Sequence, residues 1–277
     1  MPNPSLSFLD SRHGQVSVLD NKSSGPPILF MHGNSSCKEI FSKQFDSQIG
    51  KNYRCIAFDL PGHGMSRDAD LAKDSYKVSS YAELAMELIS DLGIDSIAVV
   101  GWSLGGHIGL ELMGRSDRVK ALLISGTPPI ALVDVGAAFL ASESAELTSL
   151  EEYTEAEAIK YTEATCGAAY DDFMLDAVRR TDGRSRSLMV KALISGDGIN
   201  QRDEVECNST PLAIVNGDLD PFLNPSFFNS VNFKNLWKGQ VHEIPGAGHA
   251  PFYTHHLAFN LLLDQFLNEN VLGNRNI

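Results

Sequence analysis

The sequence has few cysteines, few basic residues and no long apolar run. Its four cysteines lie far apart among 277 residues, without the close spacing of a structural metal site. This pattern is typical of reduced thiols, so we expect a cytoplasmic protein without a disulfide framework. No apolar run approaches transmembrane length, and residues 1–10 lack the basic start and apolar centre of a signal peptide.

Basic residues are outnumbered by acidic ones, 22 against 35, which gives a formal net charge of −13. This balance argues against nucleic acid or an anionic membrane surface as a partner and leaves a small molecule as the expected ligand. The chain also contains no internal repeat and no low-complexity linker. Its length suits one large α/β domain with an insertion.

A serine between glycines is the most informative motif present. Gly101-Trp102-Ser103-Leu104-Gly105 matches the G-x-S-x-G nucleophile elbow, in which a sharp strand-to-helix turn exposes the serine hydroxyl. The preceding residues, 96–100, are β-branched and apolar, as expected for a buried strand, and a helical pattern follows from His107. Side chains at the two glycine positions are expected to collide with neighbouring backbone.

Apolar runs alternate with helical patterns along most of the chain, which predicts a mostly parallel sheet covered on both faces. Ser80 and Glu83 form a capping-box pattern, which predicts the start of one of these helices. The rhythm breaks between residues 128 and 208, where no clear strand occurs. The eight predicted strands span residues 5–10, 15–20, 28–31, 53–58, 96–100, 119–124, 211–216 and 240–244.

These patterns predict an α/β-hydrolase fold with a mostly parallel eight-stranded sheet and a helical cap inserted between strands 6 and 7. The core domain is predicted at residues 1–127 and 209–277, and the cap at residues 128–208. Ligands of open α/β sheets bind outside the carboxyl ends of the strands, so the cap is expected to cover the substrate.

A base and an acid follow Ser103 in the order that this fold requires. His249 lies in a loop of small residues after the last predicted strand, where the general base is expected. The preceding strand ends in a loop with two aspartates, Asp218 and Asp220, and both are candidates for the acid. The spacing from Gly217 favours Asp220, whereas Asp218 is expected to bond local backbone.

Two backbone N–H groups are candidates for an oxyanion hole. One belongs to Leu104, directly after the nucleophile, and the other to Asn34, which follows the His32-Gly33 pair at the end of the third strand. The alternative for the second position is a plain turn into the next helix.

Aromatic residues of the cap are candidates to line a substrate pocket. Tyr161, Tyr170 and Phe173 lie in a segment with helical spacing, and for any single one of them ordinary packing within the cap is the favoured role. Phe222, in the loop of the acid, is a further candidate substrate contact. The glycine-rich segment around His63 has no phosphate-loop lysine, so we expect a structural role for it and no nucleotide cofactor.

The sequence resembles the serine-dependent N-acyl-homoserine lactonases of the α/β-hydrolase fold, which open bacterial signalling lactones without a metal. The resemblance implies Ser103, His249 and Asp220 as the catalytic triad, with Asn34 and Tyr161 near the lactone head group. Members of that family carry a glutamate at the position of Asp220, so this chain differs from them in the acid. The resemblance is carried by residues 32–36, 101–109, 126–129, 161–167, 180–184, 200–203, 235–237 and 248–252.

Two other functions remain open from the sequence: a general carboxylesterase of the same fold, and a hydrolase-fold protein that binds a small ligand without turnover. The metal-dependent lactonase motif H-x-H-x-D-H is absent from the sequence, so no metal is expected. The oligomeric state and the preferred acyl-chain length are not predicted.

Overall fold

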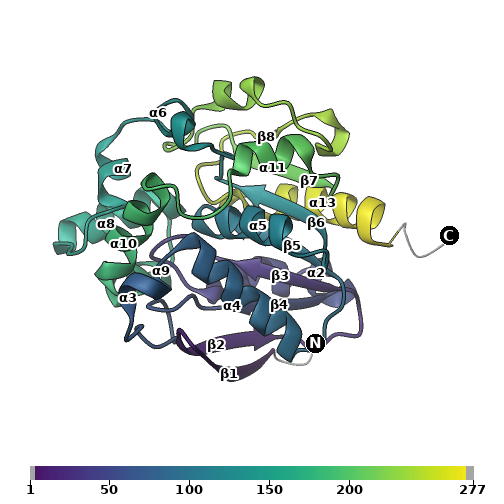
Figure 1. Cartoon of the computed structure of the whole chain (residues 1–277), viewed down its shortest axis with the longest axis horizontal. Helices are drawn as coiled ribbons and strands as arrows, with labels where there is room; N and C mark the ends of the chain where they lie inside the picture. The colour runs from purple at the N-terminus through teal and green to yellow at the C-terminus, as the bar shows by residue number, and fades with distance from the viewer. Residues whose placement is uncertain (1–3, 273–277) are drawn as a thin grey trace.

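The computed structural model describes residues 4–272, and its centre is a single eight-stranded sheet (Figure 1). The strand order is β1-β2-β4-β3-β5-β6-β7-β8. β1 and β2 run antiparallel to their neighbours, and the other strands are parallel, so the predicted sheet is confirmed. The strands are β1 (Ser5–Ser11), β2 (Gly14–Asp20), β3 (Pro27–Met31), β4 (Arg54–Phe58), β5 (Ile97–Trp102), β6 (Val119–Ser125), β7 (Leu212–Gly217) and β8 (His242–Ile244).

Helices cover both faces of the sheet and fill the insertion. No helix within residues 4–272 is both long and apolar enough to cross a bilayer. The α-helices are α1 (Ser42–Phe45), α2 (Gln48–Asn52), α3 (Ala72–Ser75), α4 (Val78–Asp91), α5 (Leu104–Arg115), α6 (Val135–Ala138), α7 (Glu143–Leu147), α8 (Glu155–Cys166), α9 (Asp172–Arg180), α10 (Gly183–Ile194), α11 (Gln201–Cys207), α12 (Pro251–Thr254) and α13 (His256–Leu267). Shorter helical turns are η1 (Lys38–Phe41), η2 (Leu132–Asp134), η3 (Pro225–Ser230), η4 (Trp237–Gly239) and η5 (Asn268–Leu272).

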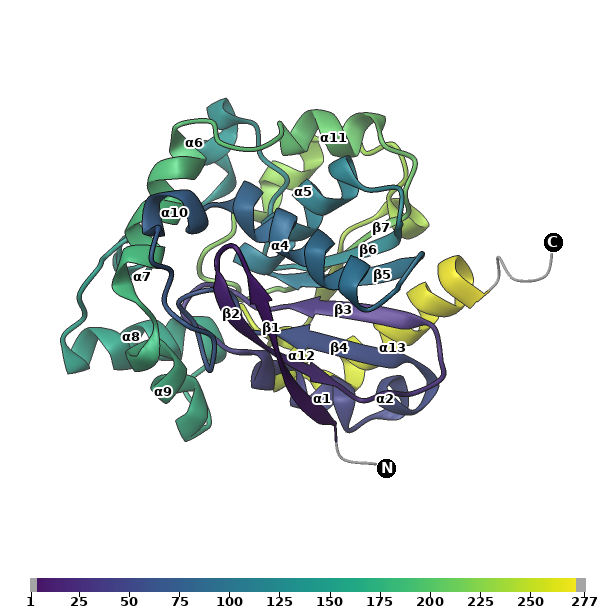
Figure 2. The same cartoon turned by 60° about the horizontal axis from the view of Figure 1, so that its bottom comes forward.

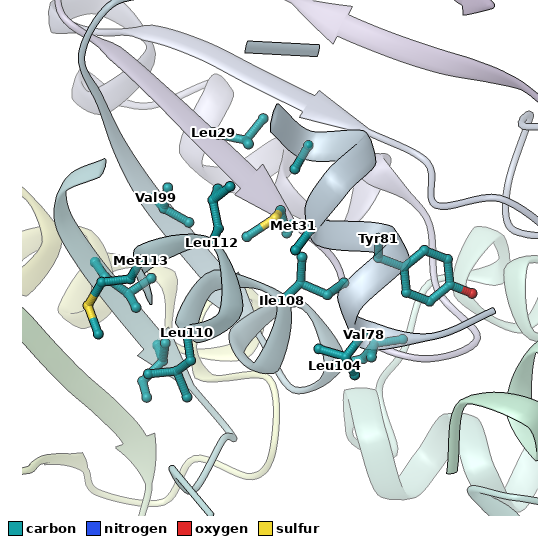
Figure 3. Close-up of a cluster of buried hydrophobic side chains, with 14 of the residues drawn as sticks. Leu29, Met31, Val78, Tyr81, Val99, Leu104, Ile108, Leu110, Leu112 and Met113 are labelled. Atoms are coloured by element: carbon teal, nitrogen blue, oxygen red, sulfur yellow. The ribbon is translucent and has the colours of Figure 1, made fainter. Parts of the chain in front are cut away.

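The parallel strands are apolar on both faces, because each face is covered by helices. Leu29 and Met31 of β3 point toward α4 and α5, where they pack with Ile108 (Figure 3). The alternate residues Ile28 and Phe30 belong to the second core on the opposite face, with the aromatic side chains of α1, α12 and α13. Fully burying an apolar side chain of this size contributes roughly 1.5–3 kcal/mol, so the two cores hold the strand ends rigidly in place.

The insertion joins β6 to β7, and its helices α7, α8, α9 and α10 lie together at one side of the molecule, whereas α11 packs against α5 (Figure 2). The turn between α9 and α10 attaches them to the core. The N–H of Asp182 donates to the carbonyl of Gly62 (2.8 Å), and the hydroxyl of Tyr76 donates to the Asp182 carboxylate (2.5 Å). The predicted helical insertion between strands 6 and 7 is therefore present.

The capping box predicted at Ser80 and Glu83 is wrong. α4 begins two residues earlier, at Val78, after an extended Lys77. Ser80 instead donates from its hydroxyl to the carbonyl of Asp74 (2.6 Å), and Glu83 pairs with an arginine of the β1–β2 turn. The tertiary contacts of both side chains therefore replace the local cap.

Candidate active site

Ser103 occupies the sharp turn between β5 and α5, with φ +53° and ψ −117°. The turn is possible because two glycines pass very close to other backbone atoms. A Cβ on Gly101 would lie within 3.0 Å of the carbonyl oxygen of Gly105, and a Cβ on Gly105 would meet the carbonyl oxygen of Met31 in the same way. Backbone strain of this kind costs of order 1–3 kcal/mol and is typical of functional turns. The prediction that a side chain at either glycine would collide with backbone is therefore confirmed.

His249 and Asp220 form a buried hydrogen-bonded pair, 2.7 Å between Nδ1 and Oδ2. A carboxylate only accepts, so Nδ1 carries the hydrogen and Nε2 is left as a base. The other oxygen of Asp220 accepts from the N–H of Phe222 (2.9 Å), which fixes the carboxylate. Asp218 is exposed and accepts from the N–H of Gly246 (2.7 Å) in the next loop, so it does not contact His249.

Neighbouring loops hold the imidazole of His249 in place. The indole N–H of Trp102 donates to the carbonyl of His249 (2.8 Å), and the ring of Phe222 lies 4.6 Å from the imidazole. Gly126, which follows β6 with φ +66°, leaves room for the ring, since a Cβ there would be 2.6 Å from His249 Cε1. The loops after β5, β6, β7 and β8 therefore meet at one point.

The two predicted oxyanion donors lie beside Ser103. The backbone of Gly33 passes close to Ser103, since a Cβ on Gly33 would be 3.2 Å from the Cβ of Ser103. Asn34 is the next residue and therefore also lies near the nucleophile. Within residues 4–272, the backbone N–H groups of Asn34 and Leu104 donate to no other protein group. The side chain of Asn34 donates to the carbonyl of Thr148 in the insertion (3.0 Å). Both N–H groups are thus available for a ligand.

A cavity of about 240 Å³ joins these groups to the insertion. Ser103, His249, Asn34 and Leu104 all line it, and most of the other lining residues are apolar. The cavity is lined by Asn34, Ser103, Leu104, His107, Gly126, Val135, Phe139, Ala145, Thr148, Ser149, Tyr161, Thr165, Met189, Val190, Leu193, Ile194, Phe222 and His249.

Tyr161 lines this cavity, but the other two aromatic candidates of the insertion do not. Phe173 packs against Tyr253 (6.2 Å between rings), and Tyr170 packs between the apolar clusters of the insertion and the core. Of the two roles considered for Tyr170 and Phe173, packing is the one that the structure shows. Burial raises the pKa of Tyr161, although Arg186 and hydrogen bonds from Thr148 and Asn34 oppose the rise. Its hydroxyl therefore stays neutral.

His107 is a cavity residue that sequence reasoning did not identify. It lies one helical turn after Ser103, and its N–H donates to the Ser103 carbonyl (3.2 Å). Burial lowers the pKa of His107 to about 4, so the ring is neutral at pH 7. The available signal was its place in the sequence, because His107 follows the elbow directly and falls in the first turn of the helix that the elbow begins.

The other histidines have structural surroundings or lie away from the cavity. His32 donates from Nδ1 to the carbonyl of Gly33 (2.8 Å) and accepts at Nε2 from the N–H of Leu60 (3.0 Å). His63 donates to the carbonyl of Pro61 (3.1 Å), as expected for a loop tie. The part of the chain that the structure describes contains no cluster of three or more potential metal-ligating side chains.

The chain is similar along most of its length to known α/β hydrolases. The sequence profile of the α/β hydrolase family matches residues 28–260. A crystal structure of a variant of the N-acyl homoserine lactonase AidH, complexed with N-hexanoyl homoserine, is 41% identical, with a TM-score of 0.95, over 97% of this chain and 98% of that one. Another AidH variant, complexed with N-hexanoyl homoserine lactone, is also 41% identical, with a TM-score of 0.94, over 96% of this chain and 98% of that one.

Among curated sequences, haloalkane dehalogenase 2 of Mycobacterium tuberculosis strain H37Rv is 28% identical over 132 residues. The match covers 46% of this chain and 45% of the dehalogenase, so it spans about half the length of each protein. The evidence for the family is therefore the profile match and the full-length structural similarity. The eight-stranded sheet, the helical insertion and the profile together place this chain in the α/β hydrolase family.

Proposed function

We propose that this protein opens the lactone ring of N-acyl-homoserine lactones, with Ser103 as the nucleophile. The reaction class is supported by one arrangement: Ser103 and His249 line a single cavity together with Asn34 and Leu104, whose backbone N–H groups are unused, and Asp220 bonds His249. The substrate is supported by the full-length similarity to AidH, whose variants have been crystallised with N-hexanoyl homoserine and with its lactone.

In the first half of the reaction, His249 Nε2 takes the proton of Ser103 as the hydroxyl oxygen attacks the lactone carbonyl carbon. The N–H groups of Leu104 and Asn34 receive the negative charge of the tetrahedral intermediate. Asp220 stabilises the imidazolium that forms. The ring C–O bond then breaks, and His249 returns its proton to the departing alkoxide, which becomes the γ-hydroxyl of the acyl-enzyme.

In the second half, water attacks the acyl-enzyme and His249 takes its proton. The ester bond to Ser103 breaks, and N-acyl-homoserine leaves with the atoms of the lactone plus one water. The γ-hydroxyl stays tethered in the meantime and could close the ring again. We assign Tyr161 to hold that hydroxyl away from the acyl carbon, because it is neutral and lines the cavity near Asn34.

The product separates this reaction from amide cleavage. A triad histidine can protonate a leaving nitrogen as well as a leaving alkoxide, so the choice between the two bonds is supported by the full-length similarity to a lactonase. We therefore propose that the amide of the substrate is left intact. A general esterase would use the same triad, so the substrate has to be decided by assay.

We also propose the division into a core at residues 1–127 and 209–277 and a cap at 128–208. Residues 1–3 and 273–277 of this division lie outside the described part of the chain. Thr148, Tyr161 and Met189 support a covering role for the cap, since each lines the cavity. The cytoplasmic location stays a prediction.

Mass spectrometry of the products tests the proposal. Purified protein is incubated with N-hexanoyl homoserine lactone, with 4-nitrophenyl butyrate as the reference ester and with or without exhaustive chelation. We expect one lactone product, heavier by one water, which closes again on acidification, and equal rates with chelator. Homoserine lactone with hexanoic acid would identify an acylase. Rapid turnover of the ester alone would identify a general esterase, and a chelator-sensitive rate restored by zinc would contradict the serine mechanism.

A further inference from the structure

His107 places a hydrogen-bond acceptor in an otherwise apolar part of the cavity. Its side chain is 7% exposed, and it lies among Phe139, Met189 and Leu193 on the cavity wall. Nδ1 is 2.8 Å from Oε1 of Gln201. Nε2 has no hydrogen-bond partner within residues 4–272.

Gln201 determines which ring nitrogen carries the hydrogen. Its amide nitrogen is 3.5 Å from the carbonyl oxygen of His107, which directs its amide oxygen to Nδ1. An amide oxygen only accepts, so Nδ1 must donate. Because burial lowers the pKa of His107 to about 4, the ring carries a single hydrogen at pH 7. Nε2 is therefore a fixed acceptor on a residue that lines the cavity.

A fixed acceptor in the cavity favours a ligand that carries a hydrogen-bond donor at the matching position. An N-acyl-homoserine lactone with a plain acyl chain has one donor, the amide N–H, and its nitrogen is two bonds from the carbonyl carbon that Ser103 attacks. His107 lies in the first turn of α5, its N–H donates to the Ser103 carbonyl (3.2 Å), and both residues line the same cavity. A donor so near the attacked carbon is within reach of the imidazole.

We infer that His107 Nε2 accepts the amide N–H of the substrate and thereby selects lactones that carry an amide on the carbon beside the attacked carbonyl. Gln201 is the positioning residue that keeps this nitrogen free of hydrogen. The inference rests on the proposed function and adds a specificity determinant to it. A site built around such a hydrogen bond disfavours an analogue without the donor, since the buried acceptor then stays unpaired.

A matched pair of substrates isolates this contact. N-hexanoyl homoserine lactone is compared with 2-(2-oxoheptyl)-γ-butyrolactone, in which a CH₂ replaces the N–H and the rest of the molecule is kept. We expect the wild-type protein to prefer the amide by about tenfold in kcat/KM, the size of one buried hydrogen bond. In His107→Phe the preference should fall to about one, and in His107→Gln, whose amide oxygen can accept, it should partly return.

His256→Phe is the control variant, because His256 begins α13 and does not line the cavity. It should keep the wild-type preference, and thermal melting checks that each variant is folded. Equal losses for both lactones in His107→Phe would show a merely structural role and overturn the inference. So would a wild-type protein that does not distinguish the two lactones. A wild-type protein that hydrolyses 4-nitrophenyl butyrate but neither lactone would contradict the proposed function, and this inference with it.

Discussion

Ser103, His249 and Asp220 come from three loops, and each supplies something that the others lack. The serine oxygen is weakly nucleophilic until a base takes its proton, and the base is useful only in one tautomer. The 2.7 Å contact between Asp220 and His249 Nδ1 fixes that tautomer. The three side chains are therefore expected to behave as a unit under mutation.

Replacing Ser103 or His249 with alanine should lower kcat by about 10⁴-fold or more, because removing one member disables the others. The double variant with both alanines should have nearly the same kcat as either single variant. Initial rates of lactone opening, with thermal melting as the control for folding, measure this. Near-normal turnover by a folded Ser103→Ala protein would contradict nucleophilic catalysis.

Asp220→Asn should reduce kcat by about 10⁴-fold, because an amide in place of the carboxylate favours the wrong imidazole tautomer. Asp218→Asn is the matched change in the same loop, and it should cost little, since an amide oxygen can still accept from the N–H of Gly246. Steady-state kinetics on both variants decide between the aspartates. The reverse order of losses would assign the acid to Asp218.

At the scale of the elements, the site depends on where β5, β6, β7 and β8 end. Gly126 illustrates this, because it follows β6 and faces the imidazole of His249. Gly126→Ala should lower kcat by about 10²-fold, since a Cβ 2.6 Å from His249 Cε1 displaces the base.

Gly136→Ala, in α6, is the control for Gly126→Ala, because a Cβ there meets nothing within 4 Å. It should leave kcat unchanged and leave the melting temperature equal or slightly higher. If both alanine variants kept full activity, the close packing of Gly126 against His249 would not matter for turnover.

The strands and the reacting residues could be predicted from the sequence because both are local signals. Buried parallel strands are apolar runs, and the turn at Ser103 requires glycine at two fixed positions. The sequence could not predict that Tyr161 lines the cavity whereas Tyr170 does not. Both lie in a segment with helical spacing, and only the tertiary contacts of the insertion distinguish them. His107 was missed for the same reason, since its partner Gln201 is 94 residues away.

At the scale of the whole molecule, buried neutral histidines should make the fold sensitive to acid. Burial lowers the pKa of His32, His63 and His107, whereas in the unfolded chain each returns to about 6.5. Below pH 6.5 the unfolded state thus binds more protons, and the free energy of unfolding falls as the pH drops toward 4. For His107, a shift from 6.5 to about 4 corresponds to roughly 3 kcal/mol.

Urea unfolding at pH 7, 6 and 5 measures this effect. We expect the free energy of unfolding to decrease steadily over that interval. His107→Gln should show a shallower decrease, because glutamine does not titrate. A wild-type value that stays constant from pH 7 to pH 5 would show that these imidazoles are already charged in the folded protein.

The two glycines around Ser103 also limit which substitutions this sequence can accept during evolution. Any change of a glycine codon to another amino acid adds at least a Cβ, and at Gly101 and Gly105 that atom would meet backbone, which cannot rotate away. Helix positions facing solvent in the insertion have no such barrier. Active descendants of this chain should therefore accumulate substitutions at those exposed helix positions, while Gly101 and Gly105 stay fixed.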